Sequence, residues 1–351
     1  MLSPWYLFLT FLLSASTVLF STPWVKKLAL QFGYVDQPNA RKVHQRPMVR
    51  LGGVAMFSGF LLALLVTWRL GGFGGLGPGK ELEMWGVALG GVAFFGIGLL
   101  DDLFNLSPFT RLIAQVIVAI GAWSMDVQIN FLSGPGISLG GLVQLPDVVS
   151  LVLTVIWLVG ITNAINWIDG LDGLAAGVSG IAALVMMITC FVMHQPAAAL
   201  VAAALAGCSL GFLRYNFNPA QIFMGDGGSY FVGFTLAGVG VIGLVKGVTT
   251  VAVLLPLILA VPIVDMSAVI LDRLRNGKSP FIADKRHLHH RLLEAGLSHR
   301  RTVLFIYALT LWVGCLAMAF SGMPNGFGYA ALSTVILSFA SWRVWQIAKQ
   351  A

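Results

Sequence analysis

Residues 163–174 read NAINWIDGLDGL and follow directly on the apolar run SLVLTVIWLVGIT at 150–162. That run is the body of a predicted helix over 147–163, close to the roughly 20 residues that a helix needs to cross the hydrocarbon core of a bilayer. The segment after it spaces two amides and two carboxylates three residues apart, at Asn163, Asn166, Asp169 and Asp172. Such groups at the end of a membrane helix are costly unless they reach water, a cation or one another. The stretch therefore predicts a membrane-spanning helix that ends in a polar site.

The composition agrees with a membrane protein. The 351 residues are 58% hydrophobic and only 10% charged, with a mean hydropathy of +0.87, whereas soluble domains carry about 25% charged residues. We predict an all-α integral membrane protein that forms one polytopic domain over 1–351. It has about eleven transmembrane helices, near 3–22, 51–70, 84–100, 110–126, 147–163, 173–193, 197–213, 229–246, 248–271, 302–321 and 326–346.

The distribution of charge predicts which way the chain crosses the membrane. No Lys or Arg precedes the first apolar run and Lys26-Lys27 follow it, which favours an uncleaved helix with its N-terminus outside. Alternation from there places 18 of the 21 Lys and Arg, and the C-terminal tail, in the cytoplasm. The cytoplasmic loops predicted to form the active site are 23–50, 101–111, 163–173, 214–228 and 272–301.

Several other functions are disfavoured. The net charge of +7 is spread over loops at the membrane edge, so we expect no nucleic-acid partner. The three cysteines fall within predicted helices and indicate no disulfide framework. No internal repeat is found, which counts against transporters built from duplicated halves.

In the outer loop, VQINFL and ISLGGLVQL flank SGPG at 133–136, a pattern that suits a short β-hairpin or coil.

The stretch GIGLLDDLFN at 96–105 ends a predicted helix in two adjacent carboxylates, Asp101 and Asp102. Two like charges side by side favour a raised pKa on one of them, or a shared cation. Either would suit acid–base chemistry on a phosphate. The alternative is a solvated helix end in which an Asp caps the next helix.

In NAINWIDGLDGL, Asn166 and Asp169 are neighbours if the helix continues. Gly170 and Gly173 weaken the helix there and allow a turn that brings Asp172 back toward Asp169. The alternative for Asp172 is an N-cap of the next helix. For the whole motif we favour a cation site over a decorated turn, because no Lys or Arg lies nearby in the sequence.

The stretch IFMGDGGSYFVG at 222–233 places Asp226 among three glycines before another helix. Backbone N–H groups of such a turn can bind phosphate, and an Asp beside them can hold the accompanying Mg²⁺. An ordinary glycine turn with a capping Asp is equally compatible. Phe223 packs at an interface or offers a stacking face to a flat base.

Two basic clusters complete the pattern. KRHLHHRLLEAG at 285–296 contains three histidines, but a zinc site is disfavoured because partner cysteines and an HExxH helix are missing. An anion site for a diphosphate fits better, and a basic loop facing anionic lipid is the alternative. DQPNARKVHQRPMVRLGG at 36–53 either binds anions or anchors the membrane edge. Its basic residues include Lys42, His44, Arg46 and Arg50.

DDLFN, NAINWIDGLDGL, FMGDGGS and HLHHRL, in this order and with this topology, resemble motifs of the polyprenyl-phosphate N-acetylhexosamine-1-phosphate transferases (glycosyltransferase family 4). The resemblance covers nearly the whole chain. It implies a membrane fold of ten or eleven helices, a homodimer, and a location in the cytoplasmic (inner) membrane of a bacterium. It also implies transfer of a sugar-1-phosphate from a UDP-sugar to a polyprenyl phosphate such as undecaprenyl phosphate. UMP is released, Mg²⁺ or Mn²⁺ is the cofactor, and the product begins a cell-envelope glycan such as lipopolysaccharide or teichoic acid.

Within this family, HLHHRLLEAGLSHR and VDQPNARKVHQRP resemble the WecA/TagO branch, which uses UDP-GlcNAc. The MraY branch has three consecutive histidines in the same motif. Here Leu288 separates His287 from His289, which disfavours a MurNAc-pentapeptide substrate.

The resemblance also implies roles for individual residues. Asp226 and Asn166 correspond to a pair that holds the metal, and Asp101, Asp102, Asp226 and His289 are the implied catalytic group, with Asp101 favoured as base toward the lipid phosphate. Asp172 and Phe223 correspond to positions that engage uracil, and Asp169 supports them. The implied substrate-binding residues are Asn105, Arg111, Asp169, Asp172, Phe223, His287, His290, Arg291, Lys42 and Arg50.

Direct in-line attack by the lipid phosphate on the β-phosphorus is the expected mechanism, and a covalent aspartyl-phosphate is the alternative. Two other classes stay open. A proton-coupled transporter would hold its carboxylates near the bilayer midplane. A non-catalytic lipid-binding scaffold would explain the basic loops but not three clusters of carboxylates.

Overall fold

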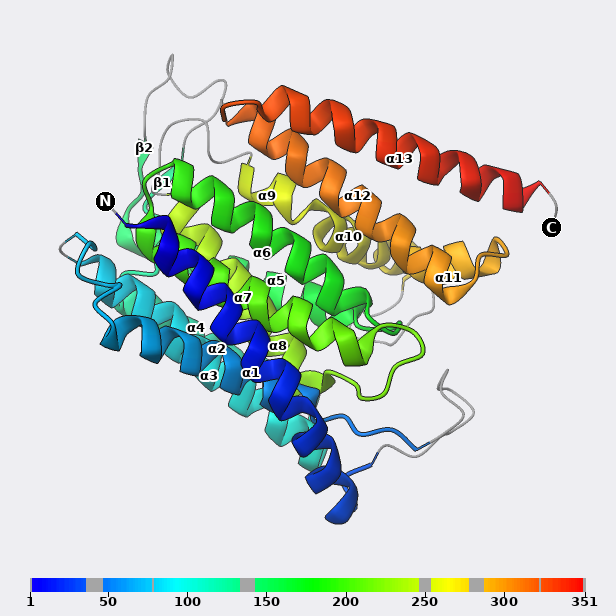
Figure 1. The fold of residues 1–351 in the computed structure, drawn as a ribbon, viewed down its shortest axis with the longest axis horizontal. Coiled ribbons are helices and arrows are strands. Elements are labelled where there is room, and N and C mark those ends of the chain that lie inside the picture. Colours follow the sequence, from blue (N-terminus) through cyan, green and yellow to red (C-terminus); the bar gives the residue numbers. More distant parts are fainter. Residues whose placement is uncertain are drawn as a thin grey trace.

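The computed structural model describes residues 2–35, 47–77, 79–132, 143–245, 254–277, 287–321 and 323–349. The described chain is a bundle of helices in which most successive helices run in opposite directions (Figure 1). Its main helices are α1 Pro4–Gln31, α2 Gly52–Arg69, α3 Lys80–Phe104, α4 Pro108–Ser124, α5 Asp147–Ile168, α6 Leu174–Val192, α7 Pro196–Asn216, α8 Gly225–Val239, α9 Leu254–Ile258, α10 Ala260–Arg275, α11 Leu288–Glu294, α12 His299–Phe320 and α13 Gly326–Ala348.

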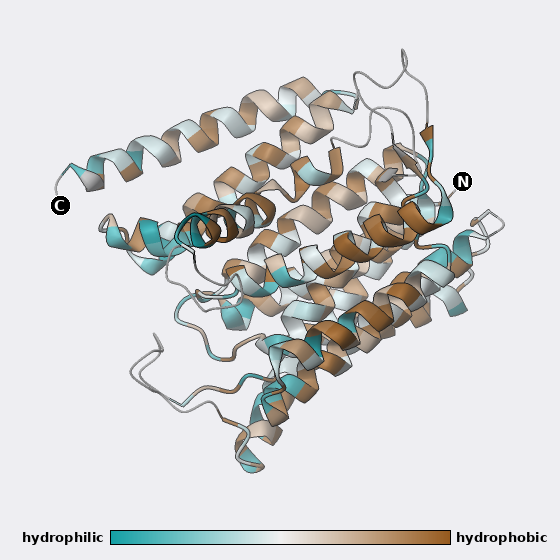
Figure 2. Ribbon diagram, turned by 180° about the vertical axis from the view of Figure 1, so that it is seen from behind, coloured by the Kyte–Doolittle hydropathy of each residue, from teal (hydrophilic) through white to brown (hydrophobic). Residues whose placement is uncertain are grey.

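Eight described helices are long and apolar enough to cross a membrane. They are α1, α2, α3, α5, α6, α7, α8 with its extension to Leu244, and α12. Hydrophobic residues cover the helix shafts, and hydrophilic residues gather at helix ends and on α11 (Figure 2). The prediction of an all-α multi-pass membrane protein is thus confirmed at this coarser level, while the number of eleven spans stays a prediction. Of the remaining apolar runs, α4 has only 17 residues.

The helices extend further than the apolar runs suggest. α1 continues through Pro23 to Gln31, so the start of the predicted loop 23–50 is helical. α3 includes Asp101 and Asp102, and α5 reaches Ile168, so both amides of the opening stretch lie on the helix. Polar residues at these ends keep helical geometry because the backbone hydrogen bonds continue past the apolar boundary.

The predicted helix over 248–271 is wrong for the described residues, 254 onward. α9 ends at Ile258 and α10 begins at Ala260. Pro262 lies in the first turn of α10 and has no N–H to donate to the carbonyl of Ile258, four residues earlier, so an unbroken helix would lose that bond. A π-helical turn, Gly240–Val245, extends α8 just before residues 246–253, which lie outside the described part.

α8 is the central helix. All of its residues except Asp226 are buried, which explains why it is apolar on every side. It packs against α3, α5 and α2, and it contacts α7 as well. Its first turn therefore lies where several helix ends meet.

The predicted loops at the two ends differ in content. At one end, β1 Phe131–Leu132 pairs antiparallel with β2 Val143–Gln144, and Phe131 lies opposite Gln144. The residues 133–142 between them lie outside the described part of the chain. The opposite end carries the last turns of α3, α5 and α10, the first turns of α4, α6 and α8, and the short helix α11 (Figure 1). All five predicted active-site loops lead to this second end.

Candidate active site

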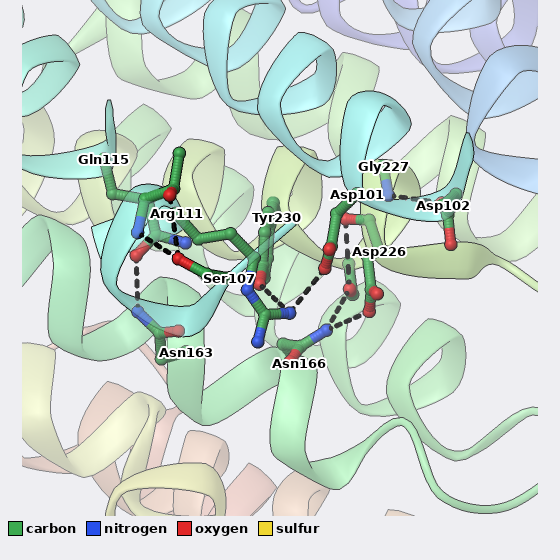
Figure 3. Close-up of polar contacts among 12 residues, drawn as sticks. Asp101, Asp102, Ser107, Arg111, Gln115, Asn163, Asn166, Asp226, Gly227 and Tyr230 are labelled. Carbon is green, nitrogen blue, oxygen red and sulfur yellow. Dashed lines mark hydrogen bonds and ion pairs between the residues drawn. The ribbon is translucent and has the colours of Figure 1, made fainter. Parts of the chain in front are cut away.

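Asp226 and Asn166 meet at the centre of the site. Asp226 is in the first turn of α8 and Asn166 is in the last turn of α5. The Asn166 Nδ2 donates to the Asp226 Oδ1 at 2.7 Å and to the Ser229 Oγ at 2.9 Å (Figure 3). The carboxylate of Asp226 remains partly accessible, with 22% of its side chain exposed. A pair predicted from two distant motifs is thus in direct contact.

Asp101 lies beside Asp226 and forms an ion pair with Arg111 of α4. The Arg111 guanidinium also donates to the Tyr230 hydroxyl at 3.3 Å. Asp101 is buried, with 5% of its surface exposed, whereas the Arg111 side chain is 27% exposed. α3, α4 and α8 are fixed to one another at this point, and Tyr230, which the sequence analysis did not select, is part of the arrangement.

Asp102 faces α8 instead. Its Oδ2 accepts from the Gly227 N–H at 2.9 Å, and its buried Oδ1 accepts no hydrogen bond. The Arg50 guanidinium lies 3.7 Å from that Oδ1 and 3.7 Å from the Asp226 Oδ2. Arg50 is thus the cation between two carboxylates that come from different helices.

Glycines let these backbones approach. A Cβ on Gly98 would lie 2.2 Å from the Asp226 carbonyl oxygen, and one on Gly53 would lie 2.3 Å from the Gly228 nitrogen. Gly225 has a φ of +74°, and a Cβ there would lie 2.0 Å from the Arg50 carbonyl oxygen. The glycine stretch therefore serves close packing. The prediction that its N–H groups bind phosphate is wrong for Gly227, whose N–H is bound by Asp102.

Asp169 and Asp172 lie beyond the end of α5. The Asp172 Oδ2 accepts from the Asn218 Nδ2 at 2.9 Å and the Ala220 N–H at 3.0 Å, so it holds the 218–220 loop. The alternative of an N-cap for Asp172 is wrong, because the N-cap of α6 is Gly173. Asp169 is the C-cap of α5. Burial and the charge of Asp226 raise the pKa of its carboxyl to about 7.

The three histidines lie at the start of α11. The rings of His287 and His289 stack, with centroids 5.6 Å apart, and the His289 and His290 centroids are 4.3 Å apart. His289 is 2% exposed, and a Cβ on Gly170 would lie 2.7 Å from its Nε2. Burial, together with the nearby His290 and His287, lowers the pKa of His289 to about 3, so its imidazole is neutral. The histidine motif thus touches the turn that follows α5. The short helix α11 itself was not predicted.

Three of the remaining predicted residues, Asn105, Phe223 and Arg291, lie in the described part of the chain. Asn105 is the exposed C-cap of α3, and its N–H donates to the Asp101 carbonyl at 2.8 Å. Phe223 is half-buried, and its N–H donates to the Val49 carbonyl at 2.8 Å. Arg291 is exposed on α11. Lys42, with His44 and Arg46, lies outside the described residues. Asp265 and Asn218 also contact the predicted residues but carried no recognisable motif.

A divalent cation fits the chemistry of this donor set. Asp101, Asp102 and Asp226 offer hard oxygen donors, and one buried oxygen of Asp102 has no hydrogen bond. In the described part of the chain, no three His, Cys, Asp or Glu side chains are grouped as a complete metal cage. Mg²⁺ needs no such cage, because it usually binds one or two carboxylates and takes its other ligands from water and substrate phosphates. Asp226 and one further group would hold it.

Comparisons with known proteins decide the family. The sequence model of the family described as "Glycosyl transferase family 4" matches residues 84–244. A probable undecaprenyl-phosphate N-acetylglucosaminyl 1-phosphate transferase of Bacillus subtilis is 39% identical over 304 residues, which are 85% of this chain and 80% of the relative. The chain belongs to glycosyl transferase family 4.

Two other relatives are similar over comparable lengths. A decaprenyl-phosphate N-acetylglucosaminephosphotransferase of Mycolicibacterium smegmatis is 37% identical over 327 residues, 87% of this chain and 79% of the relative. An undecaprenyl-phosphate alpha-N-acetylglucosaminyl 1-phosphate transferase of Haemophilus influenzae is 35% identical over 320 residues, 88% of this chain and 85% of the relative. The segment 84–244 that matches family 4 includes Asp101, Asp102, Asn166 and Asp226, whereas Arg50 and α11 lie outside it.

Proposed function

We propose that this family 4 protein transfers N-acetylglucosamine-1-phosphate from UDP-N-acetylglucosamine to undecaprenyl phosphate or another polyprenyl phosphate, with release of UMP. The observation that carries the proposal is the contact between Asp226 and Asn166 beside Asp101, Asp102 and two arginines. Relatives that are 35–39% identical over most of their length are named for this transfer. We place the site at the cytoplasmic face of the bacterial inner membrane, where both substrates' phosphates can meet.

The residues of the site suit phosphoryl transfer. A phosphate monoester has a second pKa near 6, so the lipid phosphate is largely dianionic at neutral pH. Its approach to the β-phosphorus brings negative charges together, and the guanidinium groups of Arg50 and Arg111 lie where they can offset that charge. Where the lipid phosphate is still a monoanion, Asp101 or Asp102 takes the proton from the attacking oxygen. A bound Mg²⁺ would neutralise the diphosphate and the leaving UMP.

The carboxylates lie at helix ends, which favours this enzyme over a proton-coupled transporter, whose carboxylates would lie near mid-helix. Asp101 and Asp102 are in the last turn of α3, and Asp226 is in the first turn of α8. The histidine motif and the names of the relatives favour N-acetylglucosamine over a MurNAc-pentapeptide as the sugar.

The test is the release of UMP from labelled UDP-N-acetylglucosamine by the full-length protein with undecaprenyl phosphate. We expect product only with lipid acceptor, and none after EDTA until Mg²⁺ or Mn²⁺ is restored. Asp226→Asn should lower kcat by about 100-fold or more, the usual size for loss of a central electrostatic group. Asp147→Asn makes the same change in the first turn of α5 at the other end of the bundle, and it should stay near wild type. Full activity in both Asp226→Asn and Asp101→Asn would refute the proposal.

A further inference from the structure

Asp265 of α10 is a buried carboxylate that the proposed reaction does not use. It is 7% exposed, and both of its oxygens have partners on α11. The Oδ2 lies 2.8 Å from the His287 Nδ1, and the Oδ1 accepts from the Leu288 N–H at 2.6 Å. Leu288 is the first residue of α11, where an N–H has no partner within its own helix. Asp265 therefore fixes both the ring and the backbone at the start of α11.

The contacts continue from His287 toward the site. The His287 ring stacks on His289 with an angle of 5° between the ring planes. It also makes a T-shaped contact with the Trp167 ring, with centroids 6.1 Å apart. Trp167 directly follows Asn166, the partner of Asp226. The histidine whose position depends on Asp265 thus packs against the same helical turn that holds the centre of the site.

α10 also makes a second contact to this turn. The Arg273 guanidinium lies 5.4 Å from the centroid of the Trp167 ring. Asp265 and Arg273 are eight residues apart and therefore lie on one face of α10, and both are buried. One helix thereby connects α11 to the end of α5.

These contacts of α10 and His287 hold the ring of His289 in position. Its Nε2 is buried without a hydrogen-bond partner and lies against Gly170, between Asp169 and Asp172 in sequence. A buried polar atom without a partner is rare in native proteins and often marks a functional site or an unfilled ligand position. The Nε2 can therefore serve a ligand only if the ring is held in this position.

We propose that Asp265 is a positioning residue: by holding His287 and the Leu288 N–H, it seats His289 against the 169–172 turn for binding of the UDP-sugar. This inference rests on the proposed function. Supporting groups of this kind act by locking the rotamers of the residues that touch substrate. Loss of Asp265 should therefore weaken donor binding more than acceptor binding.

Two variants of Asp265 and a control test the proposal in the full-length enzyme. Asp265→Ala removes both acceptors and should raise KM for UDP-N-acetylglucosamine at least about 10-fold, with a much smaller change in KM for the lipid. Asp265→Asn keeps an oxygen for the Leu288 N–H and can donate to the His287 Nδ1, so it should recover KM to within about 3-fold of wild type. Asp272→Asn makes the same charge change two turns further along α10 and should change neither KM.

Gly170→Ala should displace His289 directly, because the added Cβ would lie 2.7 Å from the His289 Nε2. It should also raise the donor KM, and its effect should be less than additive with Asp265→Ala, since both act through His289. Gly160→Ala, with nothing within 4 Å of its added Cβ, is the matched control.

An unchanged donor KM in Asp265→Ala would overturn the proposal. So would equal losses for donor and lipid, or full additivity with Gly170→Ala. If wild type transfers no sugar phosphate, the proposed function fails separately. Positioning is then judged by amide hydrogen exchange over 287–294 and 166–174, which Asp265→Ala should accelerate and Asp265→Asn should not.

Discussion

The ionisation of Asp169 depends on the packing of the end of α5 near the start of α8, which carries Asp226. It caps α5, and burial together with the charge of Asp226 raises the pKa of its carboxyl from 3.8 to about 7. A raised carboxyl pKa means that the folded protein binds the proton more tightly than the unfolded chain. The stability that this provides is complete below about pH 4 and is lost as pH rises toward 7.

We expect Asp169→Asn to remove this pH dependence. In EDTA, the wild-type melting temperature should fall as pH rises from about 5 to about 8, whereas the variant should lose a few degrees less over that range. Asp147→Asn, which changes an exposed carboxylate of the same helix, should follow wild type. Thermal unfolding in detergent at several pH values is the measurement. Parallel curves for Asp169→Asn and wild type would contradict the raised pKa.

At the scale of elements, the packing of α3 on α8 places the site. The Gly98 Cα faces the Asp226 carbonyl so closely that a Cβ would lie 2.2 Å from its oxygen and 2.4 Å from its carbon. Both are backbone atoms, so they cannot move aside as a flexible side chain would. The same helix pair carries Asp101, Asp102 and Asp226.

Gly98→Ala should therefore separate the two helices. We expect a loss of about 1–3 kcal/mol in stability from overpacking, and at least a 10-fold loss of transfer activity because Asp226 moves. Gly96→Ala adds the same methyl group on α3 with nothing within 4 Å, and its stability should stay within about 0.5 kcal/mol of wild type. Thermal unfolding and the UMP assay measure the two effects. Equal stability and equal activity of the two alanine variants would show that the contact between Gly98 and the Asp226 carbonyl does not position Asp226.

At the scale of the whole molecule, one end of the bundle holds the site and the distribution of Lys and Arg predicts that this end is cytoplasmic. Glu294, on α11, is exposed at the site end, and Glu81, in the first turn of α3, is exposed at the other. The native cysteines are all buried and give a low background for thiol labelling.

Glu81→Cys should react with a membrane-impermeant maleimide in intact cells, whereas Glu294→Cys should react only after the membrane is opened. The two changes are chemically identical, so each is the control for the other. Labelling of Glu294→Cys in intact cells, with Glu81→Cys protected, would invert the predicted orientation.

Much of the fold and part of the site were accessible from the sequence. Apolar runs of membrane length identify most helices, since the bilayer leaves a backbone few ways to cross it. Polar residues at the ends of those runs identify Asp101, Asp102, Asn166 and Asp226, because burying them elsewhere would be costly. The ordered motifs led to the family that the comparisons confirm.

Only the tertiary structure decided which of these groups touch. Arg111 forms an ion pair with Asp101, and Arg50 lies between Asp102 and Asp226. Asp172 accepts a hydrogen bond from the 218–220 loop. It also reveals α11 and the contact of Asp265 with it. Local sequence does not encode these pairs, because their partners lie 10 to 176 residues apart and are set by how helices with small residues at their crossings pack together.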